Sequence, residues 1–149
     1  MIAPRKLIKL VAAAVLSVAL SALSLAQPAG PNGLVTAQRT ASVTAAQFNK
    51  RTAAVFGPDA PGSLRGSLNL YKVTYRSRNA NGRNAILSGL VILPVNGAPN
   101  GLVIFNHGTT VYNNGMPSRY LGSANGSEPE TAMLAFASGG YAIAMPDYI

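Results

Sequence analysis

The chain has 149 residues, of which 48% are hydrophobic and 11% are charged, and its formal net charge at pH 7 is +8. A typical soluble domain is about 25% charged, so this composition is poor in charge and too apolar for a disordered protein. The length suits one domain with a sizeable core and excludes a large multidomain enzyme. The absence of cysteine excludes disulfides and a cysteine nucleophile, and the single histidine excludes any site that needs two.

The amino terminus has the pattern of an export signal. Three basic residues within the first nine positions precede the uncharged stretch Leu10–Leu25, which is shorter than the about 20 residues that cross a bilayer. Small residues predict cleavage after Ala26, so we expect residues 1–26 to be a signal peptide and the protein to be secreted or periplasmic. Since no second apolar run follows, no integral membrane span is expected after cleavage. An uncleaved anchor is the alternative.

The positive charge changes its meaning once the signal is set apart. Cleavage would remove three basic residues and lower the net charge from +8 to about +5. The remaining basic residues are scattered, and only Arg76, Arg78 and Arg83 come close together, around one predicted turn. We interpret these arginines as a solvated hairpin tip rather than a phosphate-binding patch. Export also separates the protein from nucleic acid, so no nucleic-acid partner is expected.

Residues 27–66 are expected to form a leader with a short helix and a loop. The segment 27–41 is rich in Pro, Gly, Ala and Thr, a composition typical of a mobile leader. Apolar residues between Ala45 and Phe56 recur on one helical face, and Gly57-Pro58 is a helix stop. The rest of this region is predicted to be loop.

The next stretch has the pattern of a β-hairpin. Leu68–Arg76 alternates apolar and polar residues, which predicts a strand with one buried face. Asn79–Gly82 has the residues of a tight turn. Ala85–Leu93 is almost wholly apolar, which predicts a second strand covered on both faces, and Pro94 ends it.

A strand, a loop, a helix and a further strand follow. Leu102–Phe105 is predicted to be a short, fully buried strand that runs into a polar loop at His107. Ser127 and Glu130 have the spacing of a capping box for the helix, and Tyr141–Met145 is the last strand. Because a helical crossover makes its two strands parallel, the sequence predicts a mixed α/β sheet. In open sheets of this kind, ligands collect at the carboxyl ends of strands, where the polar loop begins.

Two motifs of this unit resemble a known family. The stretches VIFNHGTT at residues 103–110 and SGGYAIAMPDYI at residues 138–149 are similar to the amino-terminal part of an α/β-hydrolase, and within that superfamily to exported bacterial esterases and secretory lipases. The resemblance covers residues 67–149, which we expect to be a partial hydrolase domain. It implies an incomplete amino-terminal half of the sheet, in which the last strand lies between the hairpin and Leu102–Phe105. It also implies cleavage of small-molecule or lipid esters through an acyl-enzyme.

The polar loop would supply part of the oxyanion hole. Acyl transfer develops negative charge on the former carbonyl oxygen, and fixed backbone N–H groups stabilise that charge. By resemblance, the main-chain N–H of Thr109 is the first candidate donor and that of Thr110 the second. Gly108 lets the backbone approach the substrate closely. His107 matches the family's loop-shaping histidine, and we interpret it as hydrogen-bonded in a turn rather than as a general base.

For each of four further residues, a structural role and a functional role are both possible. Asp147 matches the structural aspartate of the family's Pro-Asp-Tyr stretch, where it could cap a following helix, and we favour that role over the triad acid. Tyr112, Arg119 and Tyr120 could line an acyl pocket, but we favour a surface loop with ordinary aromatic anchors.

The residues that would perform the chemistry are missing from the sequence. The hydrolase nucleophile lies in G-x-S-x-G, followed in chain order by an acid and a histidine, and no serine in this sequence has that surrounding pattern. We therefore expect an amino-terminal fragment of a secreted serine esterase, with no nucleophile, base or acid, no cofactor and no metal, inactive alone. Without the nucleophile strand, Leu102–Phe105 would be an exposed apolar edge, so the chain is expected to be marginally stable.

Other interpretations remain open. The chain could be a short secreted binding module without catalytic activity, built on a hydrolase-derived half-sheet, or part of another enzyme of this fold such as a peptidase. A nucleotide-binding Rossmann domain is disfavoured because no G-x-G-x-x-G follows a predicted strand.

Overall fold

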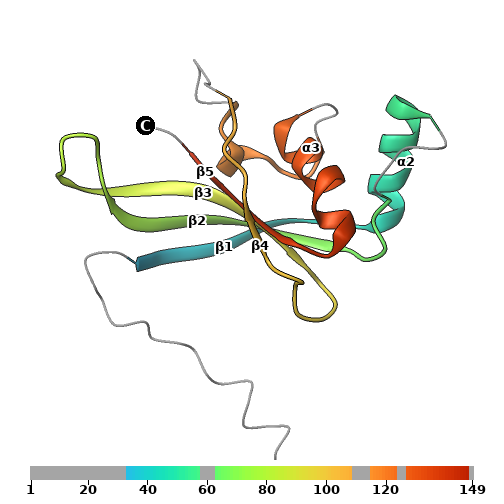
Figure 1. The fold of residues 1–149 in the computed structure, drawn as a ribbon, viewed down its shortest axis with the longest axis horizontal. Helices are drawn as coiled ribbons and strands as arrows, with labels where there is room; N and C mark the ends of the chain where they lie inside the picture. The colour runs from blue at the N-terminus through green and yellow to red at the C-terminus, as the bar shows by residue number, and fades with distance from the viewer. Residues whose placement is uncertain (1–32, 58–62, 109–114, 124–126, 148–149) are drawn as a thin grey trace, which may run out of the picture.

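The computed structural model describes residues 33–57, 63–108, 115–123 and 127–147. The strands are β1 (Gly33–Val43), β2 (Leu68–Arg78), β3 (Asn84–Pro94), β4 (Leu102–Ile104) and β5 (Ala142–Pro146). They form one sheet in the order β1-β2-β3-β5-β4 (Figure 1). β1, β2, β3 and β5 pair antiparallel in turn, whereas β4 and β5 are parallel. The predicted hairpin, the parallel pair and the position of the last strand are all confirmed.

Two α-helices, α2 (Ala45–Phe56) and α3 (Glu128–Ala135), lie on the same side of the sheet (Figure 1). The side chains of Thr44 and Gln47 form a capping box at the start of α2, which ends at Gly57 as predicted. Two short 3₁₀ helices, η2 (Pro117–Arg119) and η3 (Ala137–Gly139), lie before and after α3. Within the described ranges, no helix is long and apolar enough to cross a membrane.

The predicted capping box of α3 is only half formed. The hydroxyl of Ser127 accepts a hydrogen bond from the backbone N–H of Glu130 at 3.4 Å. The carboxylate of Glu130 pairs with Arg51 of α2 instead of reaching back to Ser127. The helix ends at Ala135, and the chain continues as η3 before Gly140 turns it with a φ of +80°.

The hydrophobic core lies between the two helices and one face of the sheet. Phe48 of α2 and Met133 of α3 are fully buried against the strands. The buried strand residues on this face are Val43, Leu68, Leu70, Leu90, Ile92, Ile143 and Met145. At the end of β4, Phe105 meets Phe136 edge-to-face with ring centroids 6.2 Å apart, so the core continues up to the loop that follows β4.

The expected leader at residues 27–41 is wrong for its described part. Gly33–Val43 forms β1, which pairs along most of its length with β2. Val43 and Phe48 belong to the core, so this region is part of the folded unit. Most β1 side chains are exposed. The sequence of this segment therefore lacks the alternation of apolar and polar residues that would predict a strand. The strand forms because its backbone groups make hydrogen bonds with the N–H and C=O groups along the edge of β2.

The expectations that β3 is covered on both faces and that Leu102–Phe105 is fully buried are wrong, whereas the exposed apolar edge expected at Leu102–Phe105 is confirmed among the described residues. Ile86 of β3 is 55% exposed, and Leu102 and Ile104 of β4 are 63% and 65% exposed. Ile86 lies on the same face as Leu90 and Ile92, but toward the end of the hairpin that projects past the helices (Figure 1). Leu102 and Ile104 are exposed because, among the described residues, no helix covers the opposite face and β4 is an edge strand. A shallow apolar groove of about 400 Å³ on that face is lined by residues that include Leu34, Val73, Tyr75, Val91, Ile104 and Ala144.

Candidate functional site

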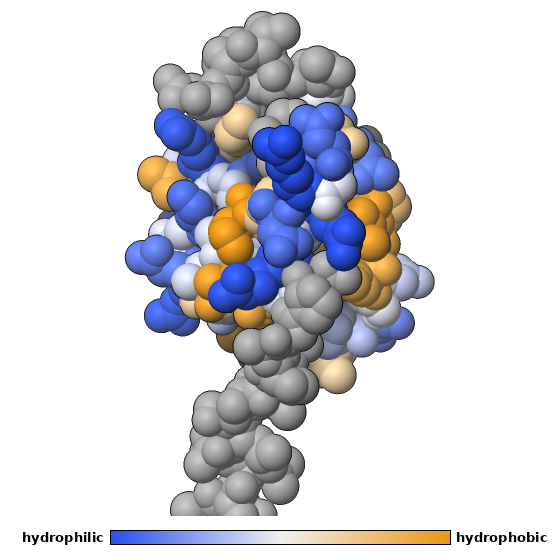
Figure 2. Space-filling model, turned by 90° about the vertical axis from the view of Figure 1, so that its left-hand side faces the viewer, coloured by the Kyte–Doolittle hydropathy of each residue, from blue (hydrophilic) through white to orange (hydrophobic). Residues whose placement is uncertain are grey.

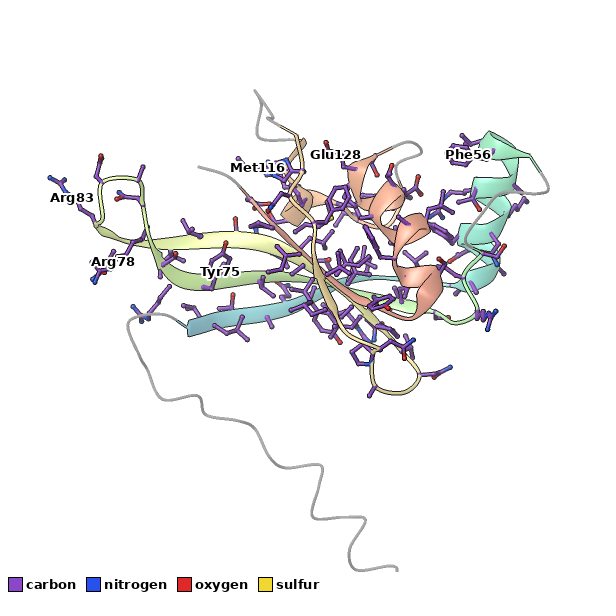
Figure 3. All side chains as sticks on the ribbon, viewed as in Figure 1. Phe56, Tyr75, Arg78, Arg83, Met116 and Glu128 are labelled. Carbon is purple, nitrogen blue, oxygen red and sulfur yellow. The ribbon has the colours of Figure 1, made fainter. Side chains whose placement is uncertain are left out.

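The candidate site begins where β4 ends. Phe105 is still bound to the sheet, because its N–H donates to the carbonyl of Ala144 at 2.8 Å. His107 and Gly108 follow immediately and leave the sheet toward the amino-terminal end of α3. Glu128, the first residue of α3, lies at this place (Figure 3). The predicted polar loop therefore starts at the carboxyl end of a parallel strand, close to a helix amino terminus.

The ring of His107 is fastened to its own loop. Its side chain is only 1% exposed, and Nδ1 lies 2.6 Å from the carbonyl oxygen of Gly108. A carbonyl oxygen can only accept, so Nδ1 carries the proton in this contact and donates it. The same nitrogen lies 3.6 Å from a carboxylate oxygen of Glu128. These contacts fix the orientation of the ring and the path of the chain around it.

Glu128 is a site residue that no motif in the sequence indicated. Its Oε1 accepts a hydrogen bond from the backbone N–H of Gly108 at 3.0 Å. A Cβ built at Gly108 would lie 3.2 Å from the same oxygen, so the glycine permits this close approach. The only signal in the sequence was the position of Glu128 in the first turn of a helix. An acidic residue is favoured there by the helix dipole, so its position does not indicate a contact with the loop.

Thr109 and Thr110, the predicted oxyanion-hole donors, lie outside the described residues, as does Tyr112. Their roles therefore stay predictions. The described part of the loop ends at Gly108, whose backbone N–H and carbonyl are bound by the carboxylate of Glu128 and the ring of His107.

Asp147, which follows β5, connects this strand to β3 and to η2. Its side chain is buried and accepts hydrogen bonds from the hydroxyl of Ser88 on β3 and from the backbone N–H of Ser118 in η2, the latter at 3.0 Å. Its own N–H donates to the Ser88 carbonyl at 2.8 Å. Burial, with the nearby Asp147 carboxylate as a second cause, raises the pKa of Tyr75 above 10.0. These contacts give the carboxylate a structural role.

The segment around η2 is anchored by an aromatic residue and by an ion pair. Tyr120 is buried in the core, whereas Arg119 is exposed, so this aromatic residue is an anchor. Arg51 of α2 contacts Glu130 of α3 at 2.9 Å and donates to the carbonyl of Gly122 at 3.0 Å. The guanidinium thus holds both helices and the preceding segment together, a role that the sequence did not indicate.

In the described part of the chain, the contacts of His107 and Glu128 hold the main-chain groups of the loop that follows β4. Within the described ranges, no group of three His, Cys, Asp or Glu side chains is placed to hold a metal ion. The chemistry available at the end of β4 is hydrogen bonding by main-chain N–H groups to an acceptor, and at Gly108 that acceptor is the Glu128 carboxylate.

Comparison with known proteins gives solved structures only. No protein-family model and no curated protein sequence matches the chain. A candidate hydrolase from Legionella pneumophila is similar in structure, with 26% identity and a TM-score of 0.65 over 78% of this chain. The rice cell wall degrading esterase LipA from Xanthomonas oryzae is similar over 82% of this chain, with 21% identity and a TM-score of 0.63. Its ligand-bound form gives 19% identity and a TM-score of 0.62.

The similarity extends beyond the segment that the sequence motifs had indicated. Residues 67–149 are a little over half of the chain, whereas the matches cover 78% or 82% of it, so they must include residues before position 67. The chain spans 30% of the length of each of these three structures.

Proposed function

We propose, on the premise that this chain has a partial α/β-hydrolase-like fold, that it is part of a secreted serine hydrolase that cleaves carboxylic esters through an acyl-enzyme. The observation that carries the proposal is the His107–Gly108 loop at the carboxyl end of β4, in a sheet whose structural neighbours include an esterase. The substrates would be small-molecule or lipid esters.

The chain's own contribution would be half of an oxyanion hole. The main-chain N–H of Thr109 would donate to the oxyanion, with Thr110 as the second candidate. Loss of one such donor costs about 3 kcal/mol in the transition state. His107 and Glu128 would act through the loop, because their contacts with Gly108 set the backbone from which Thr109 extends.

The nucleophile, the base and the acid would come from residues outside these 149. Three observations support this step. The sequence contains no G-x-S-x-G, the chain spans 30% of the length of its structural neighbours, and among the described residues β4 is an edge strand with Leu102 and Ile104 exposed. A further parallel strand on that edge would place the nucleophile turn next to the loop after β4.

The test starts with the DNA downstream of codon 149. A continuing frame that encodes G-x-S-x-G, then an acid and a histidine, is expected, and its product should hydrolyse p-nitrophenyl esters in preference to p-nitroanilides. In that product, Thr109→Pro removes the backbone N–H and should lower kcat at least 100-fold with little change in KM. Thr109→Ala keeps the N–H and is the matched control.

Three results would overturn the proposal. One is an authentic stop at codon 149 with a stable secreted product, which favours a binding module instead. Another is esterase activity of the 149-residue chain alone above the buffer rate, from a monomer that melts cooperatively. The third is equal kcat for Thr109→Pro and Thr109→Ala in the longer product, which would remove Thr109 from the oxyanion hole.

A further inference from the structure

The β2–β3 hairpin extends past the helices and ends in three arginines. Figure 1 shows the hairpin projecting beyond α2 and α3, and Figure 3 shows Arg78 and Arg83 at its tip, pointing away from the sheet. The turn is well defined, because Asn79 Oδ1 accepts hydrogen bonds from the N–H groups of Asn81 and Arg83, both at 3.0 Å. The arginines are therefore carried on a fixed scaffold.

The positive charge of this tip is not neutralised by the described carboxylates. Arg76, Arg78 and Arg83 are exposed, and none of them takes part in the ion pairs found among the described residues. Three carboxylates are described, and each is bound elsewhere: Glu128 to the loop after β4, Glu130 to Arg51, and Asp147 to Ser88 and Ser118. Although Asp147 lies near the base of the hairpin, it is buried.

An exposed apolar side chain lies among these arginines. Ile86 is 55% exposed and is the direct cross-strand partner of Arg76, so the two side chains share one face of the hairpin. Leu34, at the start of β1, is 54% exposed at the same end of the sheet, but it pairs with Tyr75 and so lies on the opposite face from Ile86. Figure 2 looks onto this end and shows hydrophobic side chains interleaved with hydrophilic ones.

The exposed Ile86 beside Arg76 changes the interpretation of these arginines as only a solvated tip. We propose that the hairpin tip, defined by Arg76, Arg78, Arg83 and Ile86, binds the surface of anionic lipid membranes. The guanidinium groups pair with anionic headgroups, and Ile86 enters the headgroup boundary between them. A soluble polyanion such as an acidic polysaccharide complements the charge, but it has no apolar interior to receive Ile86. The proposal is independent of the proposed ester hydrolysis, because it uses none of the residues of the loop after β4.

The sequence offers a site-specific probe, since it contains no tryptophan. In the full chain, Ile86→Trp places the only tryptophan at the tip, and Val55→Trp places it at an equally exposed position of α2, and selective excitation of tryptophan avoids the signal of the six tyrosines. We expect vesicles of equal phosphatidylglycerol and phosphatidylcholine to shift the emission of the first variant to shorter wavelength and not that of the second. Pure phosphatidylcholine vesicles should leave both spectra unchanged.

A charge-matched pair of variants tests the arginines. Combining Arg76→Gln, Arg78→Gln and Arg83→Gln with the tip tryptophan should weaken the vesicle affinity reported by the shift about 100-fold at low salt. The triple change Arg39→Gln, Lys50→Gln and Arg65→Gln removes the same charge from other exposed positions and should weaken it less than 5-fold.

The proposal is overturned if the tip tryptophan gives no shift with anionic vesicles, or if the α2 tryptophan gives the same shift. Equal losses from both triple variants would also overturn it, because binding would then follow net charge alone. Heparin provides the last comparison. If it binds the chain as tightly as the vesicles do, and Ile86→Ser weakens neither, the tip is a polyanion site and not a lipid site.

Discussion

The carboxylate of Glu128 accepts a hydrogen bond at 3.0 Å from the backbone N–H of Gly108, twenty residues earlier in the chain. The same side chain lies 3.6 Å from the ring of His107. One residue at the start of α3 thus holds the backbone and the side chain of the loop that follows β4. The helix that connects the two parallel strands also positions the loop at which the first of them ends.

Replacing Glu128 should release that loop. We expect Glu128→Ala to speed hydrogen exchange of the Gly108 amide about 10-fold, because a hydrogen bond to a charged acceptor is lost. Glu128→Gln keeps a side-chain acceptor and should give an intermediate rate. Amide exchange followed by NMR measures both, with Phe105 as an internal reference, since its N–H bonds to Ala144. An unchanged Gly108 rate in the alanine variant would contradict the contact.

Asp147 should be important for stability. Asp147→Ala leaves the Ser118 N–H and the Ser88 hydroxyl without their buried acceptor, and we expect the free energy of unfolding to fall by about 3 kcal/mol. Ser88→Ala removes only one of these bonds and should cost about 1 kcal/mol. Urea unfolding at pH 7 compares the two. Equal stability of the Asp147→Ala and unchanged proteins would show that the carboxylate does not hold these segments.

Tyr75 should make the fold sensitive to alkaline pH. Its pKa is raised above 10.0 by burial and by the Asp147 carboxylate, so the folded state keeps the phenol proton at pH values where the unfolded chain has lost it. Stability is therefore expected to be full below pH 10 and to fall as the pH rises above it. Tyr75→Phe should flatten this loss. Unfolding by urea between pH 9 and pH 11 measures the difference, and parallel curves for the two proteins would contradict it.

The edge of β4 should drive self-association. Ile104 is 65% exposed on β4, which is an edge strand of the sheet that the described residues form, and a charge at such a place blocks edge-to-edge pairing. We expect Ile104→Lys to keep the chain monomeric at concentrations where the unchanged chain forms larger species, as measured by light scattering during size-exclusion chromatography. Phe56→Lys, at a 60% exposed position of α2, is the control. An equal benefit from both changes would show that the edge is not responsible.

Much of the fold could be predicted, because its signals are local. The alternation of Leu68–Arg76, the turn at Asn79–Gly82 and the stop at Gly57 each depend on a few neighbouring residues, and the structure has the corresponding strand, turn and helix end. β1 was missed because its side chains are mostly exposed and its strand conformation depends on pairing with β2.

The candidate site was predicted only in part. His107 and Gly108 were found from a motif, and they lie at the end of β4 as the strand pattern indicated. The roles of Glu128 and Arg51 were not predicted, because their partners lie far away in the sequence. Glu128 binds Gly108, 20 residues away, and Arg51 binds Glu130, 79 residues away. Thr109 stays a prediction from resemblance.

The sequence by itself determined the hairpin, the two α-helices and the parallel pair with their order, but not β1, because capping, alternation and turn residues act over a few positions and need no distant contact. Only the tertiary structure decided which surfaces meet. It placed β1 on the edge of β2, Glu128 on the amide of Gly108 and Asp147 on Ser88 and Ser118. Each of these contacts satisfies polar groups across long stretches of chain. The tertiary structure also decided where the basic and apolar residues lie. Three arginines lie at the tip of the β2–β3 hairpin, and exposed apolar residues lie on the uncovered face of the sheet and along β4.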